Sequence, residues 1–180
     1  EYILSLKGET DMHPTILRFA TAFGLSPRMR FDLTVSKFTR DLALGNELLV
    51  YDAHTWRPYC HVQDFARLIQ MVIEAPREKI SFEVFNSGGE VNNATKQMIV
   101  DTIIEKIPTG KVRYQKYGSD PRNYRVNFKK VKSVLGFEPK YTIKDGVEEL
   151  ADLINNHVFD HVDANRNYFG NYEINYPIPS

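Results

Sequence analysis

Arginine is the residue type in this sequence best suited to binding an anion, because its guanidinium group stays charged and its fork of donors matches a phosphate. Arg57 leads the segment Arg-Pro-Tyr-Cys-His-Val-Gln-Asp-Phe-Ala, in which a short apolar run precedes a helix. Arg122 lies in Asp-Pro-Arg-Asn-Tyr-Arg-Val-Asn, while Arg28 and Arg30 lie close together nearer the start. The alternative for each is a surface ion pair, which contributes little to stability. Residue chemistry alone leaves both readings open for these four arginines.

Other chemistries lack the residues that they need. The sequence has no Gly-x-Gly-x-x-Gly loop and no phosphate-binding loop ending in Gly-Lys-Ser/Thr. Cys60 is the single cysteine, which excludes a sulfur-rich zinc site. His157 and His161 have the spacing of two metal ligands on one helix face, but the surrounding sequence does not favour a helix, so we expect a solvated segment. His61 lies in an apolar run and is expected to be a half-buried structural residue rather than a base.

Composition excludes several classes of partner. The 180 residues contain 23 Lys plus Arg and 23 Asp plus Glu, so no broad field attracts nucleic acid or an anionic membrane. No apolar run reaches the roughly 20 residues that span a bilayer, and the first residues lack the features of a signal peptide. A single cysteine fits a reducing compartment, so we expect a cytoplasmic protein. The first methionine is Met12, which suggests a fragment or a processed product.

The apolar pattern predicts alternating helices and strands. Residues 63–74 favour a helix that begins near Asp64, which the helix dipole would stabilise there. Five apolar residues of this helix are expected on one face, namely Phe65, Leu68, Ile69, Val72 and Ile73. Further helices are expected at 1–7, 31–44, 94–107, 127–135 and 142–155, and strands at 14–21, 47–51, 82–86 and 112–116. The strand at 14–21 reads as buried, and Arg18 within it as structural.

Capping residues mark several of these boundaries. Asn92 or Asn93 is expected to cap the helix at 94–107. Asn127 would cap the next helix, and Thr142 with Asp145 approximates a capping box for the last one. Residues 157–180 are rich in Asn, Tyr and Phe and follow neither period, so we expect an irregular tail packed on the surface or onto a partner chain.

Four stretches, taken in order, resemble the NAD-dependent epimerase/dehydratase family, the extended short-chain dehydrogenases that remodel nucleotide sugars. Leu-Arg-Phe-Ala-Thr-Ala-Phe-Gly at 17–24 is similar to the family's Leu-Arg-x-x-Asn-x-Tyr-Gly, and residues 26–30 match the next segment of the family pattern. Residues 46–64 match a strand followed by Arg-Asp-Phe-hydrophobic-His-Val-x-Asp. Residues 120–127 and 135–139 resemble the family's Asp-x-Arg and Leu-Gly-Trp-x-Pro ending. The resemblance covers about residues 3–154.

The resemblance implies roles for particular residues. Phe19 would lie beside the nicotinamide end of NAD. Thr21 stands where many members have an Asn that binds the sugar nucleotide, and a hydroxyl can still donate a hydrogen bond. Arg57 and Arg122 match two arginines that clamp the substrate diphosphate, with Arg28 and Arg30 as further candidates for binding the same substrate. No Tyr of the chain is followed four residues later by Lys, the proton relay of the family, so no catalytic residue is expected here.

The chain therefore resembles the carboxy-terminal, substrate-binding part of such an enzyme, beginning just after the catalytic lysine. The implied fold is α/β, with the last strands and helices of a Rossmann-like sheet and a small mixed substrate domain over residues 1–156. The implied ligands are a nucleotide-diphosphate sugar and, in the parent enzyme, NAD, which this chain alone would bind weakly or not at all. A homo-oligomer is expected, because an uncovered strand edge invites pairing. Two alternatives stay open: a non-catalytic nucleotide-sugar-binding module and an oligomerisation protein that uses the aromatic tail.

Overall fold

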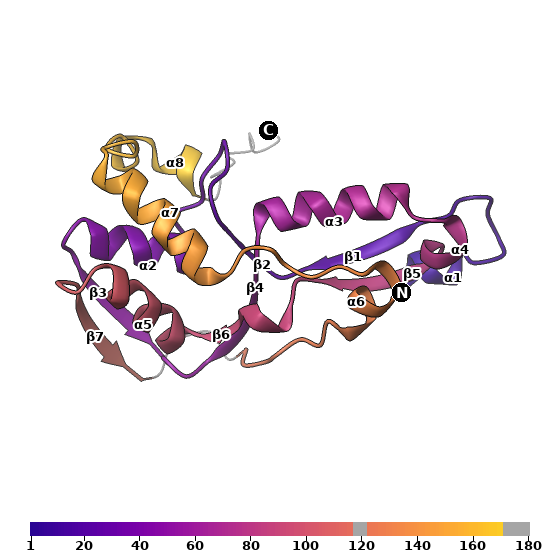
Figure 1. Ribbon diagram of the computed structural model, residues 1–180, viewed down its shortest axis with the longest axis horizontal. Helices are drawn as coiled ribbons and strands as arrows, with labels where there is room; N and C mark the ends of the chain where they lie inside the picture. The colour runs from indigo at the N-terminus through magenta and orange to yellow at the C-terminus, as the bar shows by residue number, and fades with distance from the viewer. Residues whose placement is uncertain (117–121, 171–180) are drawn as a thin grey trace, which may run out of the picture.

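The structure is a computed structural model that describes residues 1–116 and 122–170. The molecule is elongated, with one group of helices and strands at each end and a small sheet between them (Figure 1). Parallel strand pairs lie in both end groups, and the sheet in the middle is mixed. The predicted α/β class is confirmed.

One end group is built on a parallel pair of strands, β1 (Thr15–Phe19) and β5 (Glu83–Ser87). Helix α3 (Val62–Glu74) covers one face of this pair and α6 (Lys129–Leu135) lies on the other side, while α1 (Tyr2–Ser5) and α4 (Arg77–Ile80) lie at the far end (Figure 1). Its buried core joins α3, β5, α6 and the turn after α6 through six side chains, Leu68, Val72, Phe85, Phe128, Val131 and Phe137.

The other end group is built on the parallel pair β3 (Glu47–Tyr51) and β7 (Lys111–Gln115). Three amphipathic helices pack with this pair, α2 (Thr34–Ala43), α5 (Lys96–Lys106) and α7 (Ile143–Asn155). Residues from all three helices and from β3 share one apolar core, which includes Val35, Leu42, Leu48, Val50, Ile99, Ile103 and Val147. Ile99, Val100 and Ile103 form the buried face of α5, and this face enters the core.

The central sheet joins the two groups. Its middle strand, β4 (Trp56–His61), runs parallel to β2 (Thr21–Phe23) and antiparallel to β6 (Asn93–Thr95). The short helix η1 (Glu90–Asn92) leads into β6. Because β4 leads directly into α3, residues on this strand are held between the two cores.

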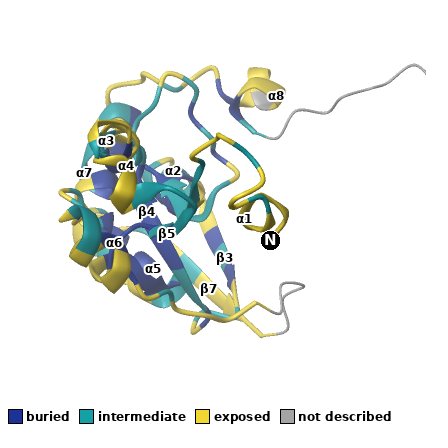
Figure 2. Ribbon diagram, turned by 90° about the vertical axis from the view of Figure 1, so that its right-hand side faces the viewer, coloured by how far each residue is buried: buried dark blue, intermediate teal, exposed yellow. Residues whose placement is uncertain are grey.

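The segment after α7 folds back onto its own chain. It contains η2 (Asp163–Asn165) and the short helix α8 (Arg166–Phe169). Val162 and Phe169 are buried against Met29 and Phe31, whereas Asn167 and Tyr168 of α8 are exposed (Figure 2). The described part of the expected tail therefore contains short helices and packs within the chain, because its few apolar residues find a partner there. Residues 171–180 lie outside the described residues.

Most elements lie where the sequence predicts them. The capping box of α7 forms, with the Thr142 hydroxyl accepting the Asp145 N–H and the Asp145 carboxylate accepting the Thr142 N–H. Gly136 ends α6 in the left-handed conformation, with φ +67°. Asn127 lies just outside α6, and its side chain accepts the Lys129 N–H at 2.8 Å, as a cap does.

Two expectations were wrong, those for the strand at 14–21 and for the cap of the helix at 94–107. The strand at 14–21 breaks at Ala20 into β1 and β2, and Arg18 and Phe19 are exposed because one described strand, β5, pairs with β1. On α3 the predicted apolar face is only partly covered: Leu68 and Val72 are buried, while Ile69 and Ile73 face solvent, because β5 and α6 cover one side of it. Helix α5 is capped by the Thr95 hydroxyl instead of an asparagine.

Among the described residues, the helices are too short or too polar to cross a membrane.

Candidate functional site

Arg57 lies on the middle strand of the central sheet. Its Nη1 donates a hydrogen bond of 2.8 Å to the carbonyl of Trp56. Its guanidinium carbon lies 5.2 Å from the centre of the Tyr124 ring, a cation–π contact. The side chain is part-buried, so its planar fork is held by a carbonyl and a ring rather than extending freely into water.

Arg122 lies on a segment that runs beside β4. The Tyr124 N–H donates to the Trp56 carbonyl at 3.2 Å, and the Trp56 N–H donates to Asn123 Oδ1 at 2.9 Å. The Arg125 guanidinium carbon lies 4.6 Å from the centre of the Trp56 ring. Residues 122–126 therefore run alongside β4 next to Arg57. Arg122 is an exposed residue of that segment. The fold brings together two segments that are far apart in the sequence.

A cavity of about 220 Å³ lies next to this segment. It is lined by Phe19 at the end of β1, by Asn86 of β5, and by Pro58 and Tyr124. The Phe19 ring is half exposed and packs edge-to-face against Phe65 at 4.5 Å. Arg18, which the sequence suggested to be structural, lines the same cavity. Ligands of α/β proteins commonly bind at the carboxyl ends of strands, where this cavity lies.

Thr21 begins β2 and is paired with Tyr59 of β4, so it lies on the strand next to that of Arg57. Burial raises the pKa of the Tyr59 phenol. The Tyr59 ring is buried in the apolar core. It therefore holds β4, the strand that carries Arg57, against that core.

Arg28 and Arg30 lie at a different place. Arg28 Nη2 donates to the Gly170 carbonyl at 2.8 Å, and Arg30 forms a two-pronged ion pair with Asp32. The hydrogen bond from Arg30 lowers the pKa of the Asp32 carboxyl. Both arginines line a cavity of about 130 Å³ together with Ser26 and Ser36. The contact with Asp32 is the surface ion pair that the sequence left as the alternative for Arg30.

The turn from β4 into α3 is held by two buried polar residues. His61 Nδ1 accepts the Gln63 N–H at 3.2 Å, and its ring stacks on Tyr141 at 4.4 Å. Asp64 is fully buried and accepts the backbone N–H groups of Lys140 and Tyr141, each at 3.0 Å. Asp64 lies in the first turn of α3, as expected, whereas His61 is fully buried and not half-buried.

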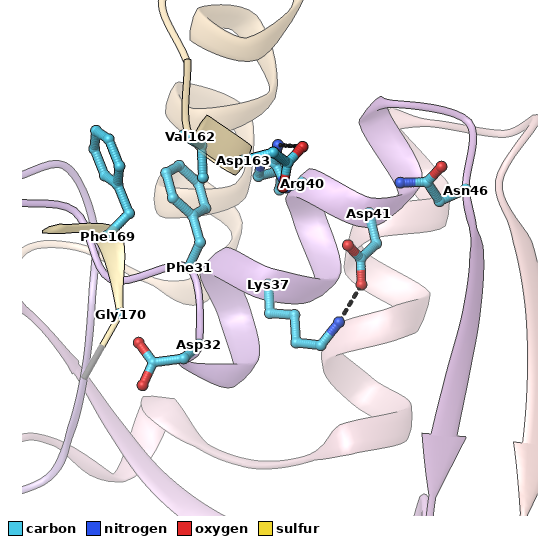
Figure 3. A pocket seen from close by; sticks show the side chains of 10 residues that line it. All are labelled: Phe31, Asp32, Lys37, Arg40, Asp41, Asn46, Val162, Asp163, Phe169 and Gly170. Carbon is cyan, nitrogen blue, oxygen red and sulfur yellow. Dashed lines mark hydrogen bonds and ion pairs between the residues drawn. The ribbon is translucent and has the colours of Figure 1, made fainter. Parts of the chain in front are cut away.

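A larger cavity, of about 630 Å³, lies between α2 and residues 162–170 (Figure 3). The two cationic side chains that line this cavity are already paired with carboxylates. Lys37 pairs with Asp41 at 2.5 Å and Arg40 with Asp163 at 2.8 Å. Paired cations of this kind attract an anionic ligand less strongly than an uncompensated cluster does. The described residues contain no group of three His, Cys, Asp or Glu side chains that could hold a metal ion.

Sequence reasoning did not identify Trp56 and Tyr124, the two side chains that hold the arginines of this region. Trp56 directly precedes Arg57, and Tyr124 follows Arg122 by two residues. An aromatic residue beside each candidate arginine was the available signal. The pairing of these residues across the fold was not visible in either segment alone.

These features define an α/β protein with arginines at the place where β4, the middle strand of the central sheet, meets residues 122–126. Residues 1–88 match the model of the NAD dependent epimerase/dehydratase family. The chain is 29% identical to a low-salt glycan biosynthesis protein of Haloferax volcanii over 83% of its own length, and 30% identical to a dTDP-glucose 4,6-dehydratase of Streptomyces niveus over 64%. The matched part spans 47% and 34% of these relatives, respectively, so the chain matches about half of their length or less.

Solved structures agree with this match. The fold superposes on UDP-glucose 4-epimerase of Thermotoga maritima, in complex with UDP-glucose, with a TM-score of 0.73 and 23% identity, over 87% of this chain and 50% of that one. It superposes on dTDP-glucose 4,6-dehydratase of Bacillus anthracis, in complex with NAD, with a TM-score of 0.72 and 25% identity. This match covers 88% of this chain and 50% of that one. The chain is similar to the NAD-dependent epimerase/dehydratase family over residues 1–88, and its fold is part of a Rossmann-like α/β architecture.

Among the described residues, the surroundings of Phe19 do not make up a complete NAD site. The cavity beside Phe19 measures about 220 Å³, below the roughly 300–1,000 Å³ of typical cofactor sites. The sequence contains no glycine-rich loop to hold a pyrophosphate. Phe19 offers an exposed ring for a flat ligand, and no chemical step through the cofactor follows from these residues.

Proposed function

We propose that this chain supplies the nucleotide-sugar-binding part of an NAD-dependent nucleotide-sugar epimerase or dehydratase. In this proposal Arg57 and Arg122 bind the diphosphate of the substrate. Thr21 contributes a hydroxyl to the sugar nucleotide, and Phe19 lies beside the nicotinamide end of NAD. Arg28 and Arg30 are secondary candidates for the same substrate.

The observation that carries the proposal is the pairing of Trp56 with Asn123 and Tyr124. These hydrogen bonds, at 2.9 and 3.2 Å, join the segment of Arg122 to the strand of Arg57. Two arginines can act on one diphosphate only if the fold brings their segments together. Each charge-assisted hydrogen bond from a guanidinium to a phosphate oxygen contributes roughly 1.5–3 kcal/mol, so a pair of such arginines would account for most of the affinity for a diphosphate.

A ligand series tests this proposal on the chain as it exists. Calorimetric titrations would compare UDP, dTDP and GDP with uridine, which carries the same base as UDP but no phosphate. We expect at least one nucleoside diphosphate to bind measurably and uridine to bind much more weakly. Equal binding of UDP and uridine would contradict a site that recognises the diphosphate.

A second candidate function is a non-catalytic nucleotide-sugar-binding module. The observation that favours it is the absence of a Tyr-x-x-x-Lys pair from these 180 residues. NAD-dependent conversion of a nucleotide sugar by the purified chain would exclude the module. Diphosphate binding without conversion would support it for this chain taken by itself.

A further inference from the structure

Asn93 connects the strand of Arg57 with the segment of Arg122. It lies on β6, directly opposite Pro58 of β4, and its side chain is buried. Its Nδ2 donates to the Val126 carbonyl at 2.9 Å, and its Oδ1 accepts the Val126 N–H at 3.1 Å. The amide thus satisfies both backbone groups of one residue, as a neighbouring strand would.

The other end of the segment is held by β4 itself. Asn123 Oδ1 accepts the Trp56 N–H, and the Trp56 carbonyl accepts the Tyr124 N–H. Residues 123–126 are therefore attached at both ends to neighbouring strands of one sheet. Tyr124, whose ring lies against the Arg57 guanidinium, is part of the attachment to β4.

We propose that Asn93 is a positioning residue for the diphosphate site: its buried amide fixes the 122–126 segment against β4 and so sets the separation of Arg122 and Arg57. This inference rests on the proposed function, because it concerns the same two arginines. Asn93 would not touch the substrate. It would act by limiting the positions that the segment can adopt before the ligand arrives, which lowers the entropic cost of binding.

The chain offers a matched control in the preceding residue. Asn92 is also a buried asparagine, and its amide makes the same two kinds of hydrogen bond, donating to the Tyr141 carbonyl at 2.9 Å and accepting the Ile143 N–H at 3.1 Å. Its partners lie at the start of α7 rather than on the 122–126 segment. Asn92→Ala and Asn93→Ala therefore remove equivalent bonds from similarly buried sites.

The first measurement is the dissociation constant for UDP, or for whichever diphosphate binds best, together with the urea midpoint of each variant. We expect both alanine variants to lower the midpoint by similar amounts. Asn93→Ala should weaken binding about tenfold, while Asn92→Ala changes it less than about twofold. Similar losses of affinity in both variants would mean that Asn93 acts through general stability, and would overturn the inference.

Asn123→Ala provides a second route if Asn93→Ala does not fold, because Asn123 is exposed and its removal spares the core. Trp56 is the single tryptophan of the chain, and it contacts Asn123 and Arg125 directly. Its fluorescence should therefore change in Asn93→Ala and Asn123→Ala and stay unchanged in Asn92→Ala. Wild-type affinity in Asn123→Ala, with an altered tryptophan signal, would contradict a positioning role for these attachments.

A double-mutant cycle separates this inference from the proposed function. If Asn93 acts through Arg122, the double variant Asn93→Ala/Arg122→Ala should bind only slightly more weakly than Arg122→Ala. If Arg122→Ala itself leaves affinity unchanged, the diphosphate role of Arg122 fails, and the positioning role fails with it. If Arg122→Ala weakens binding but Asn93→Ala does not, the proposed function stands and the positioning role alone is wrong.

Discussion

The buried carboxylate of Asp64 accepts the backbone N–H of Tyr141 at 3.0 Å, although 77 residues separate the two in the chain. The same carboxylate accepts the Lys140 N–H and pairs with Arg67 at 2.8 Å. Asp64 therefore attaches the start of α3, just beyond the strand of Arg57, to the connection that leads into α7. One side chain links the core at one end of the molecule with the core at the other.

Replacing Asp64 should cost more stability than replacing a surface acid. Asp64→Ala leaves two backbone N–H groups without their acceptor and removes the partner of Arg67, and breaking a buried pair costs about 3–5 kcal/mol. Because the Arg67 side chain is 26% exposed and can be rehydrated, we expect the lower end of that range. Urea unfolding measures the loss. Asp101→Ala, an exposed acid on α5, is the control and should change stability by less than about 0.5 kcal/mol.

Gly24 should tolerate no side chain. Its φ is +95°, and a Cβ placed on it would lie 2.0 Å from His61 Nε2. Gly45 has a similar φ of +75° but no atom within 4 Å of the same position. Gly45→Ala should therefore cost about 1–2 kcal/mol of left-handed strain alone, and Gly24→Ala clearly more, because the buried imidazole must also move. Equal losses in thermal unfolding would show that the His61 contact does not constrain this turn.

Cys60 should be unreactive while the chain is folded. Burial raises the pKa of its thiol to about 12 from an ordinary value of 9.0, and the thiolate is the reactive form. The thiol therefore stays protonated in the native state at pH 8, whereas in the unfolded chain its pKa returns to the ordinary value and a fraction ionises. Labelling with a thiol reagent should be slow in buffer and fast in concentrated urea. Rapid labelling of the native chain at pH 8 would contradict the buried position of Cys60.

The chain should associate with itself through the side that carries β1. No described strand pairs with the second edge of β1, and an uncovered edge invites pairing. Nearby apolar side chains are exposed, including those of Tyr2, Ile3, Leu4 and Phe19. Light scattering should detect species larger than a monomer, and the double variant Ile3→Lys/Leu4→Lys should reduce them, with Val158→Lys as the control. A monomer that binds no apolar dye would contradict this expectation.

Local signals in the sequence predicted the elements well. Gly45 and Gly136 end helices because they adopt positive φ, and the Thr142–Asp145 capping box forms as its spacing indicates. Such features depend on a few neighbouring residues, so they can be read without knowing the fold. The family's fold class followed from motifs of the same short length.

Contacts between distant segments could not be predicted in this way. An apolar stripe on α3 did not reveal that Ile69 and Ile73 face solvent, because that depends on which elements cover the helix. Asn93 has the residue type of a cap, but its amide binds Val126 instead, and this partner is 33 residues away. The contact between Arg57 and Tyr124 likewise depends on how the fold is assembled. Sequence indicated which arginines to consider, and the structure supplied their surroundings.

The measurement that tests the central claim most directly is the affinity of the best nucleoside diphosphate for Arg57→Ala, Arg122→Ala and Arg57→Lys. We predict that each alanine variant binds about tenfold more weakly or worse, since each loses roughly 1.5–3 kcal/mol of charge-assisted hydrogen bonding. Arg57→Lys should recover little of this, because an ammonium group lacks the planar fork. Arg40→Ala, at an ion pair outside the proposed site, should bind as the wild type does. Unchanged affinity in both alanine variants, with folding intact, would contradict the proposal that these two arginines hold the diphosphate.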